Sequence, residues 1–487
     1  MSADPLRVAI VGGGLAGLAA AVALAGEGAA GVLGRRLEIL LFESRRQIGG
    51  RATSFLDKES GEAIDHCQHV SLGCCTNLAD FCQRTGLADL FRRDRTMHFV
   101  GSDGRISQLT GSRWLPAPLH LLPSLLCLKH LTFSERLRIV WGLHRLVRAT
   151  KVDSANGQNM QQWLTTHGQT SRCIELFWLP IIVSALSEVP DRVSVPVARK
   201  VFVDGLMRAR SAYEMLVPRV PLSELYGERL TGWLQAHGVQ VQAGSAVRTI
   251  RAAEQGGLEL ELAGSVPGAN DDAPQRESYD AVICALPWRE IGSIFSPDLA
   301  ARLPFHGNLE RFKSAPISGV HLWLDRALTD LPHAVLPGRL SQWVFNRSSG
   351  NTYYYQVVIS ASHELAGRAK EDVVAQVFAE LREAFPAATD AQLLRWRIVT
   401  ERAAVFAPLP GMEELRPAQE TPVPGLFLAG DWTATGWPAT MEGAVRSGYL
   451  AAEALLAQFG SSKSVGTRIL ADDLPVARLA RWLLGVR

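Results

Sequence analysis

The sequence predicts an α/β fold with a parallel-sheet domain assembled from both ends of the chain, plus a second domain of mixed sheet and helices. Three observations lead to this prediction. An apolar, β-branched run at residues 6–11 (LRVAIV) precedes a glycine-rich turn and an Ala/Leu-rich run at 18–25. A second apolar run at 37–43 (LEILLFE) completes a strand–helix–strand unit. Near the other end, residues 425–457 have the pattern of a strand, a loop and a helix starting near residue 440.

The first turn has the spacing of a Rossmann-like dinucleotide-binding fingerprint. Gly12, Gly14 and Gly17 form Gly-x-Gly-x-x-Gly between a strand and a helix. The first glycine allows the tight turn, the second lets a diphosphate approach the backbone, and the third lets helix and strand pack closely. Glu43 ends the next strand, where a carboxylate accepts ribose hydroxyls. Its separation from Gly17 is longer than usual, and we attribute the extra length to a loop around residues 26–36.

Two further elements indicate FAD rather than NAD. Gly50 and Arg51 follow the second strand closely, and the planar guanidinium of Arg51 could bind the diphosphate. Gly430 and Asp431 end a strand near the other terminus, where the carboxylate can accept a ribityl hydroxyl. The helix that follows carries Glu442 in its first turn, and its N-terminus can stabilise negative charge on the reduced flavin. We therefore predict one noncovalently bound FAD.

These elements together resemble the FAD-dependent amine oxidase and carotenoid desaturase superfamily. That resemblance implies that Val247 holds the adenine through its backbone. The runs at 50–55 and 64–73 resemble a narrower family, the hydroxysqualene dehydroxylases, or squalene-associated FAD-dependent desaturases, of hopanoid biosynthesis. Residues 430–444 are similar to the C-terminal segment of that family. His66 stands where the family pattern has a small or amide residue, so no role is transferred to it.

The narrower resemblance implies an FAD-dependent oxidoreductase that acts on a C30 isoprenoid and reductively dehydroxylates hydroxysqualene to squalene. Such a reaction needs a general acid, a dry apolar tunnel, π-rich walls and hydride from the reduced flavin. The acid candidates are Asp65, His69 and Glu442. His69 has the most convenient ordinary pKa, and Asp65 could orient it. The candidates for the tunnel wall are Trp323, Tyr354 and Trp437.

Other activities stay open at this stage. The same fold could desaturate a carotenoid precursor such as phytoene, oxidise an amine, or serve as a flavin-binding regulatory or scaffold protein. The electron donor to FAD is also open, because the sequence lacks a convincing second dinucleotide fingerprint. Four clustered cysteines at 67, 74, 75 and 82 lack the spacing of a metal site, so we expect buried thiols and no metal.

Composition narrows the class of protein. A chain of 487 residues is too long for one compact core, so we expect two or three domains. A net charge of +2 is too balanced for a protein held to nucleic acid by its overall field. Seven cysteines without regular spacing favour the reducing cytoplasm. We expect neither a secretory signal nor a transmembrane helix, so any contact with a membrane would be from the side.

Two segments have the composition of lipid-contacting helices. In 472–487, Asp472 or Asp473 would cap a helix and Pro475 would lie in its first turn. The second segment, 114–148, places many leucines beside Lys and Arg. We therefore expect a protein on the inner face of the cell membrane that takes its isoprenoid substrate from the bilayer.

The middle of the chain predicts helices at 112–150 and 221–237, paired strands at 238–250, a surface loop at 264–278, a buried strand at 279–286 and an antiparallel sheet from 317–324 and 352–360. The predicted division is FAD-binding segments at 1–80, 221–290 and 401–460, a helical substrate and membrane-facing segment at 81–220, a substrate-domain sheet at 291–400, and a linker with an amphipathic C-terminal helix at 461–487.

Overall fold

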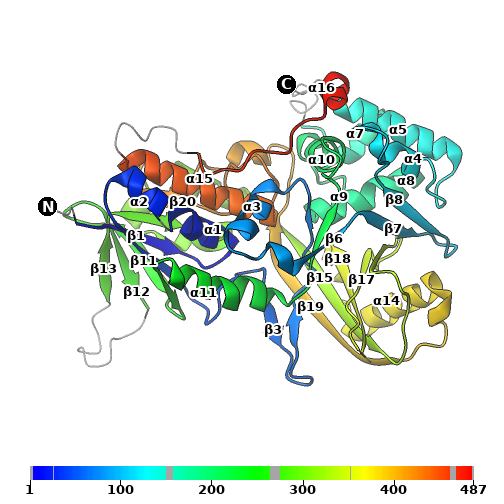
Figure 1. Ribbon diagram of the computed structural model, residues 1–487, viewed down its shortest axis with the longest axis horizontal. Helices are drawn as coiled ribbons and strands as arrows, with labels where there is room; N and C mark the ends of the chain where they lie inside the picture. Colours follow the sequence, from blue (N-terminus) through cyan, green and yellow to red (C-terminus); the bar gives the residue numbers. More distant parts are fainter. Residues whose placement is uncertain are drawn as a thin grey trace.

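A computed structural model describes residues 4–25, 27–149, 157–263, 275–350, 352–460 and 468–484. It confirms the α/β fold with a parallel sheet built from distant parts of the chain (Figure 1). In Figure 1 this sheet and its helices occupy the left half of the molecule, while a second sheet and a group of helices occupy the right half.

The parallel sheet has five strands in the order β10-β2-β1-β14-β20. All four neighbouring pairs are parallel. Their bounds are β1 Leu6–Val11, β2 Leu37–Glu43, β10 Val239–Ala243, β14 Ala281–Cys284 and β20 Leu426–Leu428. Strands β1, β14 and β20 are almost wholly buried, which explains why they are apolar runs in the sequence.

Different layers cover the two faces of this sheet. On one face lie α1 (Leu15–Leu24) and α15 (Met441–Phe459), which pack closely against each other, with α3 (Thr76–Arg84) beside α15 and α11 (Arg229–Ala236) against the same core. On the other face lies an antiparallel sheet of β11 (Val247–Ala252), β12 (Leu258–Leu262) and β13 (Arg276–Tyr279). The N-terminal and C-terminal glycine motifs therefore meet at one edge, since α1 and α15 begin there.

The second sheet has seven strands in the order β19-β15-β18-β17-β16-β7-β8. Their bounds are β7 Thr96–Val100, β8 Ile106–Thr110, β15 Ser314–Leu324, β16 His333–Val335, β17 Trp343–Asn346, β18 Tyr353–Ser360 and β19 Leu393–Phe406. The predicted pairing of 317–324 with 352–360 is confirmed, because Ile317 lies opposite Ser360 in an antiparallel ladder. Helix α14 (Lys370–Ala384) packs on one face of this sheet.

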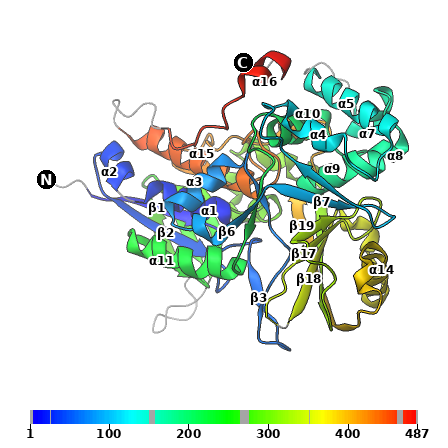
Figure 2. The same ribbon diagram turned by 45° about the vertical axis from the view of Figure 1, so that its right-hand side comes forward.

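A group of helices above the second sheet surrounds a core of its own (Figure 2). These helices are α4 Leu122–Leu125, α5 Phe133–Val147, α7 Met160–Thr166, α8 Ser171–Cys173, α9 Leu179–Leu186 and α10 Val195–Phe202. Helix α5 begins with a capping box, in which Thr132 and Glu135 each accept a hydrogen bond from the backbone of the other. The helices predicted within 112–150 are confirmed at 119–125 and 133–147, whereas residues 112–118 are not helical.

Several predicted elements are wrong in detail. Residues 238–250 do not form a strand pair, because β10 joins β2 in the parallel sheet and β11 starts a different sheet. The expected loop at 26–36 contains the helix α2 (Glu27–Leu33). Segment 81–220 is not only helical, since β7 and β8 belong to the second sheet. The loop predicted at 264–278 lies largely outside the described residues, and its last three residues belong to strand β13 instead.

The C-terminal helix α16 spans Arg478–Leu484 and so starts later than predicted. Asp473 does not cap it. Its carboxylate instead forms an ion pair with Arg446 at 2.9 Å, which holds the chain before the helix against α15. Among the described residues, every helix is too short or too polar to cross a bilayer.

Candidate FAD-binding and active site

The first glycine turn has two packed glycines and one open glycine. Gly12 has a φ of +111°, and a side chain there would meet the Ala285 carbonyl at 2.8 Å. A Cβ on Gly17 would lie 2.0 Å from the Gly12 carbonyl oxygen. Gly14, at the N-terminus of α1, has open space where its side chain would be, with no heavy atom within 4 Å. The turn therefore exposes backbone to a ligand at the second glycine, as predicted for a diphosphate.

The second glycine turn lies directly against the first. The Gly49 N–H donates to the Gly13 carbonyl at 2.8 Å. A Cβ on Gly50 would lie 3.0 Å from the Gly14 Cα. These contacts place the predicted residues Gly50 and Arg51 beside the open N-terminus of α1.

Glu43 lies at the end of β2, with its carboxylate turned into the first turn. One oxygen accepts the Gly13 N–H at 2.8 Å, and the other accepts the Arg45 N–H at 2.8 Å and the Ser44 hydroxyl at 3.2 Å. The side chain is buried. A carboxylate offers about four acceptor positions, so it can hold the loop and still accept a ribose hydroxyl.

Arg51 and Asp431 join the two ends of the chain. The guanidinium of Arg51 donates to Asp431 Oδ2 at 2.9 Å, across 380 residues of sequence. Asp431 is only 4% exposed, and its other oxygen, Oδ1, is buried without a hydrogen-bond partner among the described residues. A buried carboxylate oxygen needs a donor. The ribityl hydroxyl predicted for this position would supply one, so the residues present fit FAD.

The loop after β20 is held by Arg416, which sequence reasoning missed. Its guanidinium donates to the carbonyl oxygens of Asp431 and Thr433 and to the Thr435 hydroxyl, at 2.9–3.0 Å. The Gly430 N–H donates to Ser447 Oγ on α15 at 2.8 Å. These bonds fix the backbone on which Asp431 stands. Nothing in the local sequence distinguishes Arg416 from a surface arginine.

Val247 begins β11, close to the end of β2. The Ser245 N–H donates to the Glu43 carbonyl at 2.9 Å, so the chain entering β11 passes beside the predicted ribose-binding residue. This position suits contact with the adenine end of the cofactor. The backbone role of Val247 stays a prediction.

Asp65, the first acid candidate, is buried and already accepts hydrogen bonds from other parts of the chain. It is 4% exposed, and its Oδ1 accepts the Ser54 hydroxyl at 2.6 Å and the Leu222 N–H at 2.9 Å. Its other oxygen lies 3.6 Å from the Arg347 guanidinium. Arg347 also donates to Gln68 Oε1 at 3.0 Å, and so ties the 65–69 segment to the second sheet. These contacts favour a structural role for Asp65, and its part in catalysis stays a prediction.

His69, the second candidate, has a well-defined tautomer. Its Nδ1 lies 3.0 Å from the Cys67 carbonyl, so Nδ1 carries a proton. Burial opposes protonation of the ring, but the Cys67 side chain and carbonyl, helped by Asp65, outweigh it and raise the pKa of His69 to about 9. Within the described residues, Nε2 makes no hydrogen bond. Asp65, which we expected could orient His69, makes no hydrogen bond to it and acts on it only through its charge.

Glu442, the third candidate, lies in the first turn of α15 and is 1% exposed. Its two oxygens accept the backbone N–H groups of Asn77 and Leu78 at 3.2 and 2.8 Å, and the Asn77 side-chain amide at 3.0 Å. Burial raises the pKa of Glu442, against these hydrogen bonds. The carboxylate thus caps the start of α3 and joins it to α15, which weighs against contact with substrate.

The three aromatic candidates are already in contact with neighbours. Trp323 and Tyr354 stack with ring centroids 4.7 Å apart. The Arg395 guanidinium covers Trp323 at 3.7 Å, and the Lys200 ammonium lies 4.7 Å from the ring of Trp437. A ring that already faces a protein cation is a poor partner for a cationic substrate. These contacts disfavour Trp323 and Trp437 as tunnel walls.

The four clustered cysteines, 67, 74, 75 and 82, are free thiols. Cys74 and Cys82 are buried, and Cys67 and Cys75 are partly buried. Within the described part of the chain, no three His, Cys, Asp or Glu side chains are grouped closely enough to hold a metal ion.

The chain belongs to the family of flavin-containing amine oxidoreductases, whose pattern matches residues 15–456. It is therefore an FAD-dependent oxidoreductase. The structure is similar to that of cyclohexylamine oxidase from Brevibacterium oxydans, with a TM-score of 0.63, 17% identity and coverage of 93% of this chain and 99% of that one. The fold and the cofactor predicted from the sequence are thereby confirmed.

Two curated relatives differ in activity. Hydroxysqualene dehydroxylase of Rhodopseudomonas palustris is 29% identical over 465 residues, which cover 92% of this chain and 98% of that protein. The 15-cis-phytoene desaturase of Synechococcus elongatus is 25% identical over 472 residues, which cover 93% of this chain and 96% of that protein. These relatives support the superfamily predicted from the sequence. Because their activities differ, they do not identify the substrate of this protein.

Proposed function

We propose that this protein reductively dehydroxylates a C30 isoprenoid alcohol, hydroxysqualene, to squalene. In this reaction the allylic C–O bond breaks, the hydroxyl leaves as water with one added proton, and the carbon receives a hydride. Bound FAD, in its reduced form, supplies that hydride. The chain itself must supply the proton and exclude bulk water.

The observation that supports this proposal is the environment of His69. Its Nδ1 is fixed by the Cys67 carbonyl, Nε2 is free of protein partners in the described residues, and negative charge on Cys67 and Asp65 raises its pKa, which favours the protonated ring. A dehydroxylase needs such a proton donor, whereas removal of hydride from a hydrocarbon does not. The segment 64–73 that contains His69 also resembles the dehydroxylase family.

Oxidative desaturation of a carotenoid precursor is the second candidate, because phytoene desaturases match the chain over a similar length. The two reactions run in opposite redox directions. Dehydroxylation consumes reduced flavin, whereas desaturation consumes oxidised flavin. An amine oxidase would also start from oxidised flavin.

Anaerobic single turnover separates these candidates. Photoreduced holoprotein mixed with hydroxysqualene should regain oxidised-flavin absorbance and yield squalene in the extract by mass spectrometry. His69→Ala should slow this step about 10²–10⁴-fold with FAD still bound. His237→Ala, on an exposed histidine outside the site, is the matched control. If reduced flavin persists with hydroxysqualene and oxidised holoprotein instead desaturates phytoene, the proposal is wrong.

A further inference from the structure

Helix α5 carries an apolar stripe that no described part of the chain covers. Phe133, Leu137 and Trp141 are 66%, 49% and 55% exposed. They are spaced four residues apart, so they lie along one side of the helix. On the opposite side, Ile139 and Leu146 are fully buried in the helical core. The helix is thus anchored by one face and presents a second, solvent-facing apolar face.

Positive charge surrounds this stripe. Arg138 and Arg145 are exposed on α5, and the exposed Arg148 follows the helix directly. The only acidic residue of the helix, Glu135, is buried, caps its start and pairs with Arg172 at 2.9 Å. From residue 112 to 149 the chain has six Lys or Arg and one Asp or Glu, although its overall charge is only +2. The segment that contains α5 is therefore far more basic than the protein as a whole.

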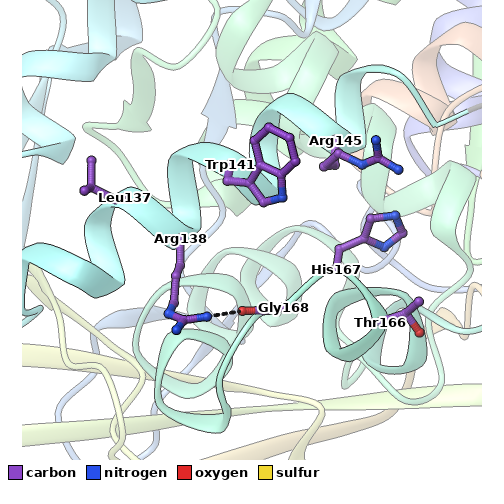
Figure 3. Close-up of a pocket in the computed structure, with 7 residues that line it drawn as sticks. All are labelled: Leu137, Arg138, Trp141, Arg145, Thr166, His167 and Gly168. Carbon is purple, nitrogen blue, oxygen red and sulfur yellow. Dashed lines mark hydrogen bonds between the residues drawn. The ribbon is translucent and has the colours of Figure 1, made fainter.

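A shallow groove of about 550 Å³ opens beside the stripe, between α5 and the end of α7 (Figure 3). It is lined by Leu137, Arg138, Trp141, Arg145, Thr166, His167 and Gly168. Arg138 donates to the Gly168 carbonyl at 3.2 Å, and the Arg145 guanidinium lies 5.9 Å from the Trp141 ring centroid. Along α5, the indole of Trp141 lies between these two arginines (Figure 3). Apolar and cationic groups therefore alternate on one surface.

The tail reaches the same side of the molecule. Ala480 of α16 packs in a small core with Val147, at the end of α5, and Val203. Figures 1 and 2 both show α16 close to α5. Arg478 and Arg481 are exposed on α16, so they add positive charge beside the stripe.

We propose that this face of α5 docks onto an anionic phospholipid bilayer. Phe, Leu and Trp side chains partition into the boundary between headgroups and acyl chains, while arginines bind lipid phosphates. A second copy of this chain fits the face poorly, because a two-fold contact centred on the stripe would bring the arginines of one copy against the arginines of the other. The inference rests on the exposure and charge of α5 and does not depend on which substrate the enzyme uses.

The test uses FAD-loaded protein and flotation with vesicles of phosphatidylcholine, alone or mixed with phosphatidylglycerol. Wild-type protein should float with the mixed vesicles at low salt. Leu137→Glu with Trp141→Glu should lower the partition coefficient at least about tenfold, since two charges replace apolar groups at the boundary. Leu56→Glu and Leu394→Glu, at positions 70% and 65% exposed elsewhere, should leave it unchanged. Bound FAD, measured by absorbance, reports that each variant is folded.

A charge series tests the electrostatic part. Arg138→Gln with Arg145→Gln should weaken binding to anionic vesicles roughly 25-fold, at about fivefold per arginine. The same change at the exposed Arg302 and Arg311 removes an equal charge elsewhere on the protein, so it should affect vesicle binding only through the protein's net charge.

The proposal is overturned if wild-type protein does not bind anionic vesicles at low salt, or if the Leu137 and Trp141 variant binds as wild type does. A wild-type dimer that this variant converts to monomer, without vesicle binding, would also overturn it and assign the face to a second copy. Vesicle binding is measured without substrate, so its failure is distinct from failure of the proposed dehydroxylation.

Discussion

Replacing Glu43 with alanine should lower both the free energy of unfolding of the apoprotein and its affinity for FAD. The two effects can be measured separately. In the protein, the carboxylate accepts the backbone N–H groups of Gly13 and Arg45, both at 2.8 Å. Gly13 is buried, so its N–H would lose the one side-chain partner that it has among the described residues, whereas the exposed Arg45 can turn to water. A hydrogen bond to a charged acceptor contributes about 1.5–3 kcal/mol, so the free energy of unfolding of the apoprotein should fall by about that amount.

The free energy of FAD binding should weaken by a similar amount, because alanine cannot accept hydrogen bonds from the ribose hydroxyls. A loss of about 1.5–3 kcal/mol corresponds to a rise in Kd of roughly 10- to 150-fold. Urea unfolding of the apoprotein measures the first effect, and fluorescence titration of folded apoprotein with FAD measures the second. Glu38→Ala, on the same strand but partly exposed in an ion pair with Arg7 at 3.6 Å, is the matched control. Unchanged FAD affinity in folded Glu43→Ala would refute the assignment of the ribose-binding residue.

Three further predictions concern the cofactor and the acid. Acid precipitation should release a yellow supernatant with the spectrum of free FAD, and colour retained in the pellet would contradict noncovalent binding. Asp431→Ala should lower FAD affinity, as followed by equilibrium dialysis, because it removes the carboxylate oxygen that no described residue contacts by a hydrogen bond and also removes the ion-pair partner of Arg51; affinity equal to wild type would exclude Asp431 from the site. The rate of reduced-flavin oxidation by hydroxysqualene should stay constant through neutral pH and fall as pH rises through about 9, because His69 then loses its proton; stopped-flow traces that decline near pH 6.5 instead would show an unshifted histidine. Since the pKa is raised on folding, His69 also contributes to stability fully below about pH 6.5, and this contribution is lost as pH rises through about 9.

The cofactor-binding turns could be predicted because their chemistry is local. The spacing of Gly12, Gly14 and Gly17 follows from close packing within one strand–turn–helix unit, and a single sequence displays it. Asp431 was predictable for the same reason, at the end of an apolar strand. Its pairing with Arg51 was not predicted, since the partners lie 380 residues apart and only the sheet order brings them together.

Strands whose partners are distant were harder to place. Residues 238–250 have alternating polarity with Ala-Gly-Ser between two runs, a pattern typical of a hairpin. The structure divides them because β10 adds to the free edge of β2, where Val239–Ala243 pairs with Ile39–Glu43. The short strands β7 and β8 were missed because the leucine-rich sequence that follows them has a stronger helical pattern.

The sequence left three acid candidates open and favoured His69 only by its ordinary pKa, whereas the structure gives the three residues very different surroundings. A carboxylate whose oxygens already accept buried N–H or O–H groups must break those bonds before it can be protonated and turned towards a substrate, and each broken bond costs about 1–3 kcal/mol. Asp65 is held by Ser54 and Leu222, and Glu442 by Asn77 and Leu78. His69 faces no such cost, because its fixed nitrogen is Nδ1 and the proton at issue is on Nε2. His69 is therefore the best candidate for the general acid. Asp65 raises the pKa of His69 through its charge, while its own hydrogen bonds keep it from turning towards a substrate.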